Sequence, residues 1–232
     1  GDNVQYRITL VEGWTFAQAM AEISRSAKLV LELQDLPRDE IAKRMELDYD
    51  NPEGMLFPDT YFYTKGATDL DLLRRANQRL REVLETAWQA RLGALPYDNN
   101  YQALTMASII EKESSSLSER GHIAGVFVRR LEQGMRLQSD PTVIYGMGED
   151  YSGDLRRADL VLATAYNTYR INGLPPTPIA LAGIDSITAS LNPLPSDYLY
   201  FVAKGDGSHY FSSTLEEHNA AVDRFQRQPQ TQ

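Results

Sequence analysis

The chain of 232 residues is predicted to be an α+β protein, with a small mixed unit, a connecting helix, and a mainly helical unit that carries a short antiparallel sheet. Residues 4–10 alternate between apolar and polar side chains, as a half-buried strand does. From about residue 69 to residue 134, apolar residues recur three or four positions apart, which is typical of helices packed on a core. Near the end, residues 198–203 and 208–212 flank a Gly-Asp-Gly turn and predict a hairpin.

The first unit is expected to span residues 1–66. After its opening strand, Thr15 and Gln18 have the spacing of a capping box, which opens a helix running to about residue 26. The remaining elements are a short helix at 37–47, a loop rich in Pro, Gly and Asp at 48–59, and an aromatic strand at 60–64.

Residues 67–98 are predicted to connect the units through one helix. Thr68 and Asp71 have the spacing of a second capping box, and the helix is expected to reach about Leu92. Its apolar positions, which indicate a buried stripe, are Leu73, Ala76, Leu80, Val83, Ala87 and Trp88.

The second unit, which is mainly helical, is expected to span residues 99–225. Asn99 or Asn100 is predicted to cap its first helix, and Ser118 to cap a second helix that stops at Gly134. The pair Asp140-Pro141 predicts a further helix start, with Asp140 as the cap and proline at the first helical position. The later elements are a short helix at 184–191, a last helix opened by Thr214 and Glu217, and a low-complexity tail at 226–232 that is expected to fray.

Composition excludes several classes of function. The net charge of −9 disfavours nucleic acid and anionic membrane surfaces as partners. The absence of cysteine excludes disulfides and thiolate metal sites, and the three histidines lack the spacing of a zinc site. No zinc or thiolate metal site is therefore expected. No run of about 20 apolar residues is present, so no membrane span is predicted.

The first helix of the second unit ends in two carboxylates that point in different directions. Five residues of this helix form one apolar arc: Ala103, Met106, Ala107, Ile109 and Ile110. At about 100° per residue, Glu113 projects roughly 50° from the centre of that arc and Glu111 roughly 120° from it. A partly dry surrounding would raise the pKa of Glu113, as the acid of glycosidic bond cleavage requires. The alternative is a solvated glutamate that pairs with Lys112 or Arg120.

Blocks of sequence on both sides of this helix carry a family resemblance. They are Val11-Glu12-Gly13-Trp14-Thr15, Pro52-Glu53-Gly54-Met55-Leu56-Phe57-Pro58-Asp59-Thr60-Tyr61, Glu111-Lys112-Glu113-Ser114, the run from Gly134 to Gly146, Thr164-Ala165-Tyr166-Asn167-Thr168-Tyr169, Gly173-Leu174-Pro175-Pro176, Tyr198-Leu199-Tyr200-Phe201-Val202, the turn from Gly205 to His209, and Glu217-His218-Asn219. In order and spacing they resemble the YceG-like family, the endolytic murein transglycosylases of bacterial cell-wall metabolism. The resemblance covers most of the chain and is densest from residue 101 to residue 219.

The resemblance implies both a fold and a set of site residues. The first unit would be a LysM-like subdomain, either a sugar binder or a structural brace. The catalytic glutamate falls in the Glu-Lys-Glu run, and the Glu-Ser pair points to Glu113. Asn167 would hold an N-acetyl group and the tyrosines beside it would pack on sugar rings, unless that loop is only structural. The expected substrate-binding residues are Gln138, Asp140, Tyr166, Asn167, Thr168 and Tyr169.

The activity that the resemblance implies is lytic cleavage of glycan strands between N-acetylmuramic acid and N-acetylglucosamine. Its products would be 1,6-anhydro ends, it would need no metal and no organic cofactor, and its partners would be peptidoglycan strands and peptidoglycan synthases. Family members carry an N-terminal anchor in the inner membrane and act in the periplasm, so this chain is expected to be a piece of such a protein. The alternatives are a muramidase, which hydrolyses the same bond, and a non-catalytic glycan-binding scaffold.

Overall fold

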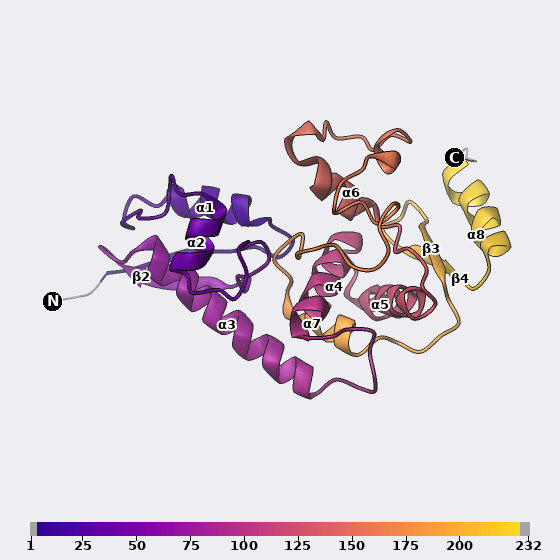
Figure 1. Ribbon diagram of the computed structural model, residues 1–232, viewed down its shortest axis with the longest axis horizontal. Helices are drawn as coiled ribbons and strands as arrows, with labels where there is room; N and C mark the ends of the chain where they lie inside the picture. The colour runs from indigo at the N-terminus through magenta and orange to yellow at the C-terminus, as the bar shows by residue number, and fades with distance from the viewer. Residues whose placement is uncertain (1–3, 228–232) are drawn as a thin grey trace.

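A computed structural model describes residues 4–227 (Figure 1). The first unit contains strand β1 (Gln5–Thr9), which pairs antiparallel with β2 (Thr60–Thr64) so that Gln5 lies opposite Thr64. Helices α1 (Phe16–Ser24) and α2 (Arg38–Arg44) lie in the chain between these strands. The capping box that opens α1 is confirmed, because the side chain of Thr15 accepts from the N–H of Gln18 and the side chain of Gln18 accepts from the N–H of Thr15.

Helix α3 (Asp69–Gln89) contributes to two apolar cores. Leu72 and Leu73 near its start pack with Phe16 and Ile23 of the first unit. Later residues of the helix, Leu80, Val83 and Leu84, pack into the core of the second unit. In Figure 1 this helix runs from beneath β2 to the loop that leads into α4. The predicted connecting helix is therefore present, and it belongs to both cores.

The second unit is built around helix α4 (Asn100–Glu113), which is capped by Asn99. Helices α5 (Leu117–Glu132), α6 (Asp140–Met147), α7 (Ile184–Leu191) and α3 all contact it. As a result every residue of α4 from Ala103 to Ile110 is buried, including Thr105 and Ser108. Between α6 and α7 the chain forms two short 3₁₀ turns, η1 (Gly148–Asp150) and η2 (Asp159–Val161).

The end of the chain adds a small sheet and a helix beside α5. Strand β3 (Tyr200–Ala203) pairs antiparallel with β4 (His209–Ser212), so the predicted hairpin is confirmed with a later start for its first strand. Helix α8 (Leu215–Val222) begins at the capping box of Thr214 and Glu217, and a π turn, η3 (Asp223–Arg227), follows it. The predicted frayed tail lies mostly outside the described residues.

Two predicted caps were wrong. Ser116 rather than Ser118 precedes α5; the hydroxyl of Ser118 lies within hydrogen-bond distance of the Ser116 hydroxyl instead of capping a helix. Ser139 rather than Asp140 takes the N-cap position of α6, so Asp140 is already helical and its carboxylate is engaged elsewhere. In both cases the helix begins earlier than predicted: Ser118 has only a local contact with Ser116, and the carboxylate of Asp140 accepts from the hydroxyl of Tyr169, 29 positions away.

Polar contacts also join the two units. Glu53, which is fully buried, accepts hydrogen bonds from the N–H of Phe16 in α1 (2.7 Å) and from the hydroxyl of Tyr145 in α6 (2.9 Å). The ammonium of Lys112 donates to the carbonyl of Gly13 (3.2 Å).

The helices and the two small antiparallel sheets confirm the α+β class, whereas the LysM-like character of the first unit and the domain boundaries stay predictions. Within residues 4–227, no helix has both the length and the apolar character needed to cross a bilayer.

Candidate active site

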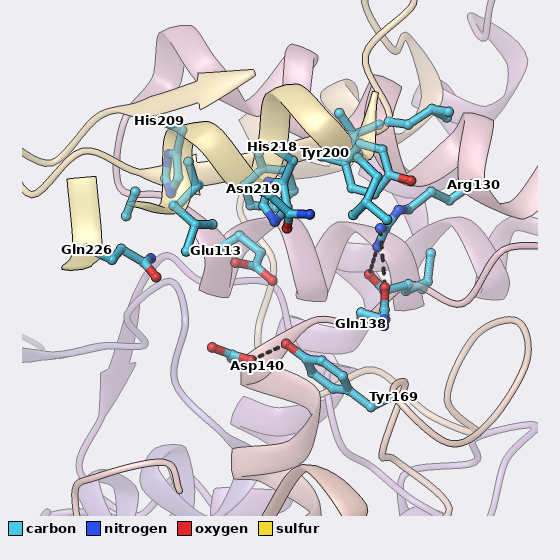
Figure 2. Close-up of a pocket in the computed structure, with 18 residues that line it drawn as sticks. Glu113, Arg130, Gln138, Asp140, Tyr169, Tyr200, His209, His218, Asn219 and Gln226 are labelled. Carbon is cyan, nitrogen blue, oxygen red and sulfur yellow. Dashed lines mark hydrogen bonds between the residues drawn. The ribbon is translucent and has the colours of Figure 1, made fainter. Parts of the chain in front are cut away.

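A cavity of about 500 Å³ lies between the end of α4 and the β3–β4 hairpin with α8 (Figure 2). Its floor includes apolar side chains such as Val126 and Leu137. Its polar lining residues come from several elements and loops: Glu113, Arg130, Gln138, Asp140, Tyr169, Tyr200, His209, His218, Asn219 and Gln226. The cavity thus brings together residues that are more than 100 positions apart in the chain.

Glu113 is the last residue of α4 and directs its carboxyl group into this cavity (Figure 2). Burial raises its pKa to about 7, against an ordinary value of 4.5, because a dry surrounding disfavours the charged form. The hydroxyl of Ser139 donates to Glu113 Oε1 (2.5 Å) and lowers the pKa, while the charge of nearby Asp140 raises it. Glu113 is therefore a carboxyl group that can hold and release a proton near neutral pH.

The neighbouring residues of the Glu-Lys-Glu run have structural contacts. Glu111 Oε1 accepts from Arg120 Nη2 (2.8 Å), and its Oε2 accepts from the N–H of Gly183 (3.0 Å). Both partners of the Glu111–Arg120 ion pair are about 5% exposed. Glu111 is thus a buried carboxylate outside the cavity whose charge is balanced by Arg120. The alternative that Arg120 pairs with Glu113 does not hold.

The segment from Gln138 to Asp140 forms the edge of the cavity opposite the hairpin. Gln138 has a left-handed backbone (φ 53°), which is uncommon outside glycine, and its N–H donates to the carbonyl of Thr168 (3.2 Å). Its side-chain oxygen accepts from Arg130 Nη2 (3.3 Å). Asp140 Oδ1 accepts from the hydroxyl of Tyr169 (2.6 Å), and burial together with this contact raises the pKa of Tyr169. Gln138, Asp140 and Tyr169, all predicted site residues, therefore meet at the cavity.

The other predicted binding residues do not line the cavity. Asn167 is fully buried; its amide donates to the carbonyls of Leu160 (3.1 Å) and Leu162 (2.7 Å). Thr168 is also fully buried, and its hydroxyl accepts from the N–H of Ser139 (2.9 Å). The hydroxyl of Tyr166 lies within hydrogen-bond distance of the Thr177 hydroxyl (2.9 Å). The burial of Asn167 and Thr168 corrects the expectation that these two side chains contact sugar directly, because they hold the loop together instead. The expected packing of the half-buried Tyr166 ring on a sugar stays a prediction.

Several cavity residues were not predicted as site residues. His209 Nδ1 lies 2.8 Å from Glu119 Oε2, so the hairpin and α5 hold its ring in place. His218 stacks on Tyr200 with ring centroids 5.2 Å apart, and burial with the charge of Arg130 lowers its pKa. Both residues belong to the family blocks described above, but the pairing of β3 with β4 places His209 at the cavity and the following helix α8 places His218 there. Among residues 4–227, no cluster of three or more His, Asp or Glu is arranged to hold a metal ion.

Comparison with known proteins gives consistent matches. The model of the YceG-like family matches residues 1–224. An endolytic murein transglycosylase of Bacillus subtilis is 40% identical over 174 residues, which cover 75% of this chain and 48% of that protein. An endolytic murein transglycosylase of Streptococcus pneumoniae is 32% identical over 201 residues, covering 84% of this chain and 35% of that protein.

A solved structure matches the fold as well. The crystal structure of a YceG-like protein from Listeria monocytogenes has a TM-score of 0.74 and 33% identity, covering 94% of this chain and 75% of that one. The chain spans about half the length, or less, of the curated relatives that it matches.

Proposed function

Because the chain belongs to the YceG-like family, we propose that it is the catalytic part of an endolytic peptidoglycan transglycosylase. One observation carries the proposal: the carboxyl group of Glu113 faces a sugar-sized cavity, and burial raises its pKa to about 7. The two relatives described above are named for this activity. The substrate is the glycan strand of peptidoglycan, and the bond cleaved joins N-acetylmuramic acid to N-acetylglucosamine.

In this mechanism, one carboxyl group acts first as an acid and then as a base. Protonated Glu113 donates its proton to the glycosidic oxygen as the bond to C1 breaks. The N-acetyl carbonyl of the substrate stabilises C1. Glu113, now a carboxylate, takes the proton from the C6 hydroxyl of the muramic residue, and that oxygen closes a 1,6-anhydro ring on C1. Glu113 ends protonated as it began, and water is not consumed.

Within the Glu-Lys-Glu run, only Glu113 lines the cavity. Glu111, the other carboxylate of the run, is held in an ion pair with Arg120 and does not reach the cavity. The aromatic rings of Tyr169 and Tyr200 line the cavity and offer surfaces on which sugar rings can pack. The side-chain amides of Gln138 and Asn219 supply hydrogen-bond donors for the hydroxyl and N-acetyl groups.

The test is mass spectrometry of muropeptides after digestion of purified sacculi. The unmodified chain is expected to release products with anhydro ends. Glu113→Gln is expected to release none, because an amide cannot deliver the proton, while the exposed Glu132→Gln serves as a matched control and stays active. Normal turnover by Glu113→Gln, with a folded protein by circular dichroism, would sink the assignment of Glu113 as the acid, whereas no turnover by the unmodified chain would leave a glycan-binding scaffold as the function.

A second candidate function is a muramidase that hydrolyses the same bond. It is favoured by one observation, the carboxylate of Asp140, which lines the same cavity and whose charge raises the pKa of Glu113. A hydrolase needs such a second carboxylate to activate water or to act as a nucleophile. Its products carry reducing ends rather than anhydro ends, so the same mass spectra separate the two reactions.

The place of the enzyme in the cell is also proposed from the family. The intact protein is anchored in the inner membrane with this region in the periplasm, and it cuts nascent strands made by peptidoglycan synthases, which ends strand elongation. Crosslinking of the intact protein in living cells, followed by identification of the captured proteins, tests the partnership. Capture of cytosolic proteins only would contradict this location.

A further inference from the structure

Glu113 is held by a buried network of hydroxyl groups that starts at the N-cap of α6. Ser139 is 1% exposed, and Thr142 and Thr168 are fully buried. The hydroxyl of Ser139 donates to Glu113 Oε1 (2.5 Å). Among the described residues Glu113 Oε2 has no hydrogen-bond partner, and the carboxyl group faces the cavity. The two oxygens of the acid therefore have different surroundings.

The backbone of Ser139 is held on both sides by the two threonines. Its N–H donates to Thr168 Oγ1 (2.9 Å), and its carbonyl accepts from the hydroxyl of Thr142 (2.7 Å). The two threonine hydroxyls are 2.8 Å apart. Since the hydroxyl hydrogen of Thr142 is used on the carbonyl of Ser139, the hydrogen of Thr168 must donate to Thr142 Oγ1. All directions in the network are thus determined, and the only hydroxyl hydrogen left for Glu113 is that of Ser139.

We propose that Ser139, clamped by Thr142 and Thr168, is a positioning residue that selects Oε2 of Glu113 as the oxygen that carries the transferred proton. A hydroxyl that donates to Oε1 leaves that oxygen an acceptor in both protonation states. The acidic hydrogen then resides on Oε2, on the cavity side. When the proton has left, the same hydroxyl stabilises the carboxylate until it takes the next proton. This inference rests on the proposed role of Glu113.

Other charged or titratable groups surround Glu113 and have to be separated from the effect of Ser139. Asp140 on α6, Tyr169 on its loop, Arg130 on α5, His209 on β4 and His218 on α8 line the same cavity. Within the described residues, none of these groups makes a hydrogen bond to Glu113, whereas Ser139 does. A measurement that reports the carboxyl group of Glu113 alone, such as a ¹³C-carboxyl NMR titration, distinguishes its pKa from theirs.

The experiment compares Ser139→Ala and Ser139→Thr with the unmodified chain. Ser190→Ala is the matched control, because Ser190 is another fully buried serine whose hydroxyl makes one hydrogen bond, to the carbonyl of Ile187 (2.8 Å). Each variant is titrated by NMR at Glu113, and kcat and KM are measured against pH on a soluble glycan.

Ser139→Ala is expected to raise the pKa of Glu113 by about one pH unit, since a hydrogen bond that favours the charged form is lost. The alkaline limb of kcat/KM moves upward with it, and kcat falls about tenfold with little change in KM. Ser139→Thr keeps the hydroxyl and is expected to restore both values. Ser190→Ala is expected to change neither.

A Glu113 pKa that is the same in Ser139→Ala and the unmodified chain would overturn the inference, and so would equal losses of kcat in Ser139→Ala and Ser190→Ala. If Ser139→Thr does not fold, Thr142→Val provides the second perturbation. It leaves Ser139 and Glu113 intact but removes the hydroxyl that donates to the Ser139 carbonyl, which keeps only the N–H of residue 142 as a donor, so a smaller rise of the same pKa is expected. Cleavage by Glu113→Gln would contradict the proposed function, whereas the NMR titrations would still show separately whether Ser139 controls the Glu113 carboxyl group, because they do not depend on turnover.

Discussion

Replacing Glu113 by glutamine is expected to stabilise the protein at alkaline pH while it removes activity. The pKa of Glu113 is about 7 in the folded chain, against 4.5 for an ordinary glutamate. A folded-state pKa above the unfolded value means that the folded chain binds more protons between these two pH values. Its free energy of unfolding therefore falls as pH rises through this window. At about 1.4 kcal/mol for each pKa unit, the loss is about 3 kcal/mol above pH 7.

Glutamine is close to protonated glutamate in shape and stays uncharged at every pH. At pH 4, the variant and the unmodified chain are thus expected to have similar free energies of unfolding in urea. At pH 8, the variant is expected to be more stable by up to about 3 kcal/mol. The Ser139 hydroxyl can still donate to the amide oxygen, so the local network survives the change.

Glu111→Gln is the matched control for this measurement, because Glu111 is the buried carboxylate two residues away. It is paired with Arg120, so its replacement leaves a buried charge uncompensated and is expected to destabilise the chain at both pH values. If Glu113→Gln gave the same difference in stability at pH 4 and pH 8, the carboxyl group would not have a raised pKa, and the reasoning on the acid would be refuted.

Three further changes test the loop, the contact between units and the second carboxylate. Asn167→Ala removes a buried amide that donates to two carbonyls, so we expect the free energy of unfolding in urea to fall by about 2–3 kcal/mol. An unchanged free energy of unfolding would mean that water replaces these contacts and that the amide does not hold the loop. Gly54→Ala places a Cβ 2.3 Å from the Cβ of Pro178 at a φ of 72°, so thermal unfolding is expected at a clearly lower temperature; an unchanged Tm would contradict this close approach. Asp140→Asn removes a charge that raises the pKa of Glu113, so the alkaline limb of kcat/KM is expected to move to lower pH with anhydro products retained. Loss of all activity in the folded Asp140→Asn variant would favour the muramidase.

Features that depend on residues close together in the chain could be predicted from the sequence. The capping boxes at Thr15 and Thr214 join residues three positions apart, and the strand at 60–64 and the helix at Ile184–Leu191 were placed at their observed bounds. Asn99 caps α4, one of the two caps considered. These elements form because the interactions that start and stop them are local, so no knowledge of the fold is needed to recognise them.

The assignment of Glu113 had a different basis. The arc of apolar residues favoured Glu113 over Glu111, but α4 is buried all round from Ala103 to Ile110, so an apolar surrounding does not separate the two carboxylates that follow. What separates them is their partners. Glu111 faces the guanidinium of Arg120, whereas Glu113 faces an open cavity and one hydroxyl. Periodicity along one helix contains no information about which neighbouring element supplies a charge.

The sequence by itself determined the α+β class, the main helices and the carboxylate run at the end of α4. Only the tertiary structure decided which residues meet there. Ser139 reaches Glu113 across 26 positions, and Thr168 reaches Ser139 across 29, while Asn167 turns its amide away from the cavity. The physical reason is that a hydrogen bond or a burial penalty depends on distances in space, and the packing of α4 against α6 and the following loop sets these distances. A motif names the residues, but their contacts determine which of them can hold a proton.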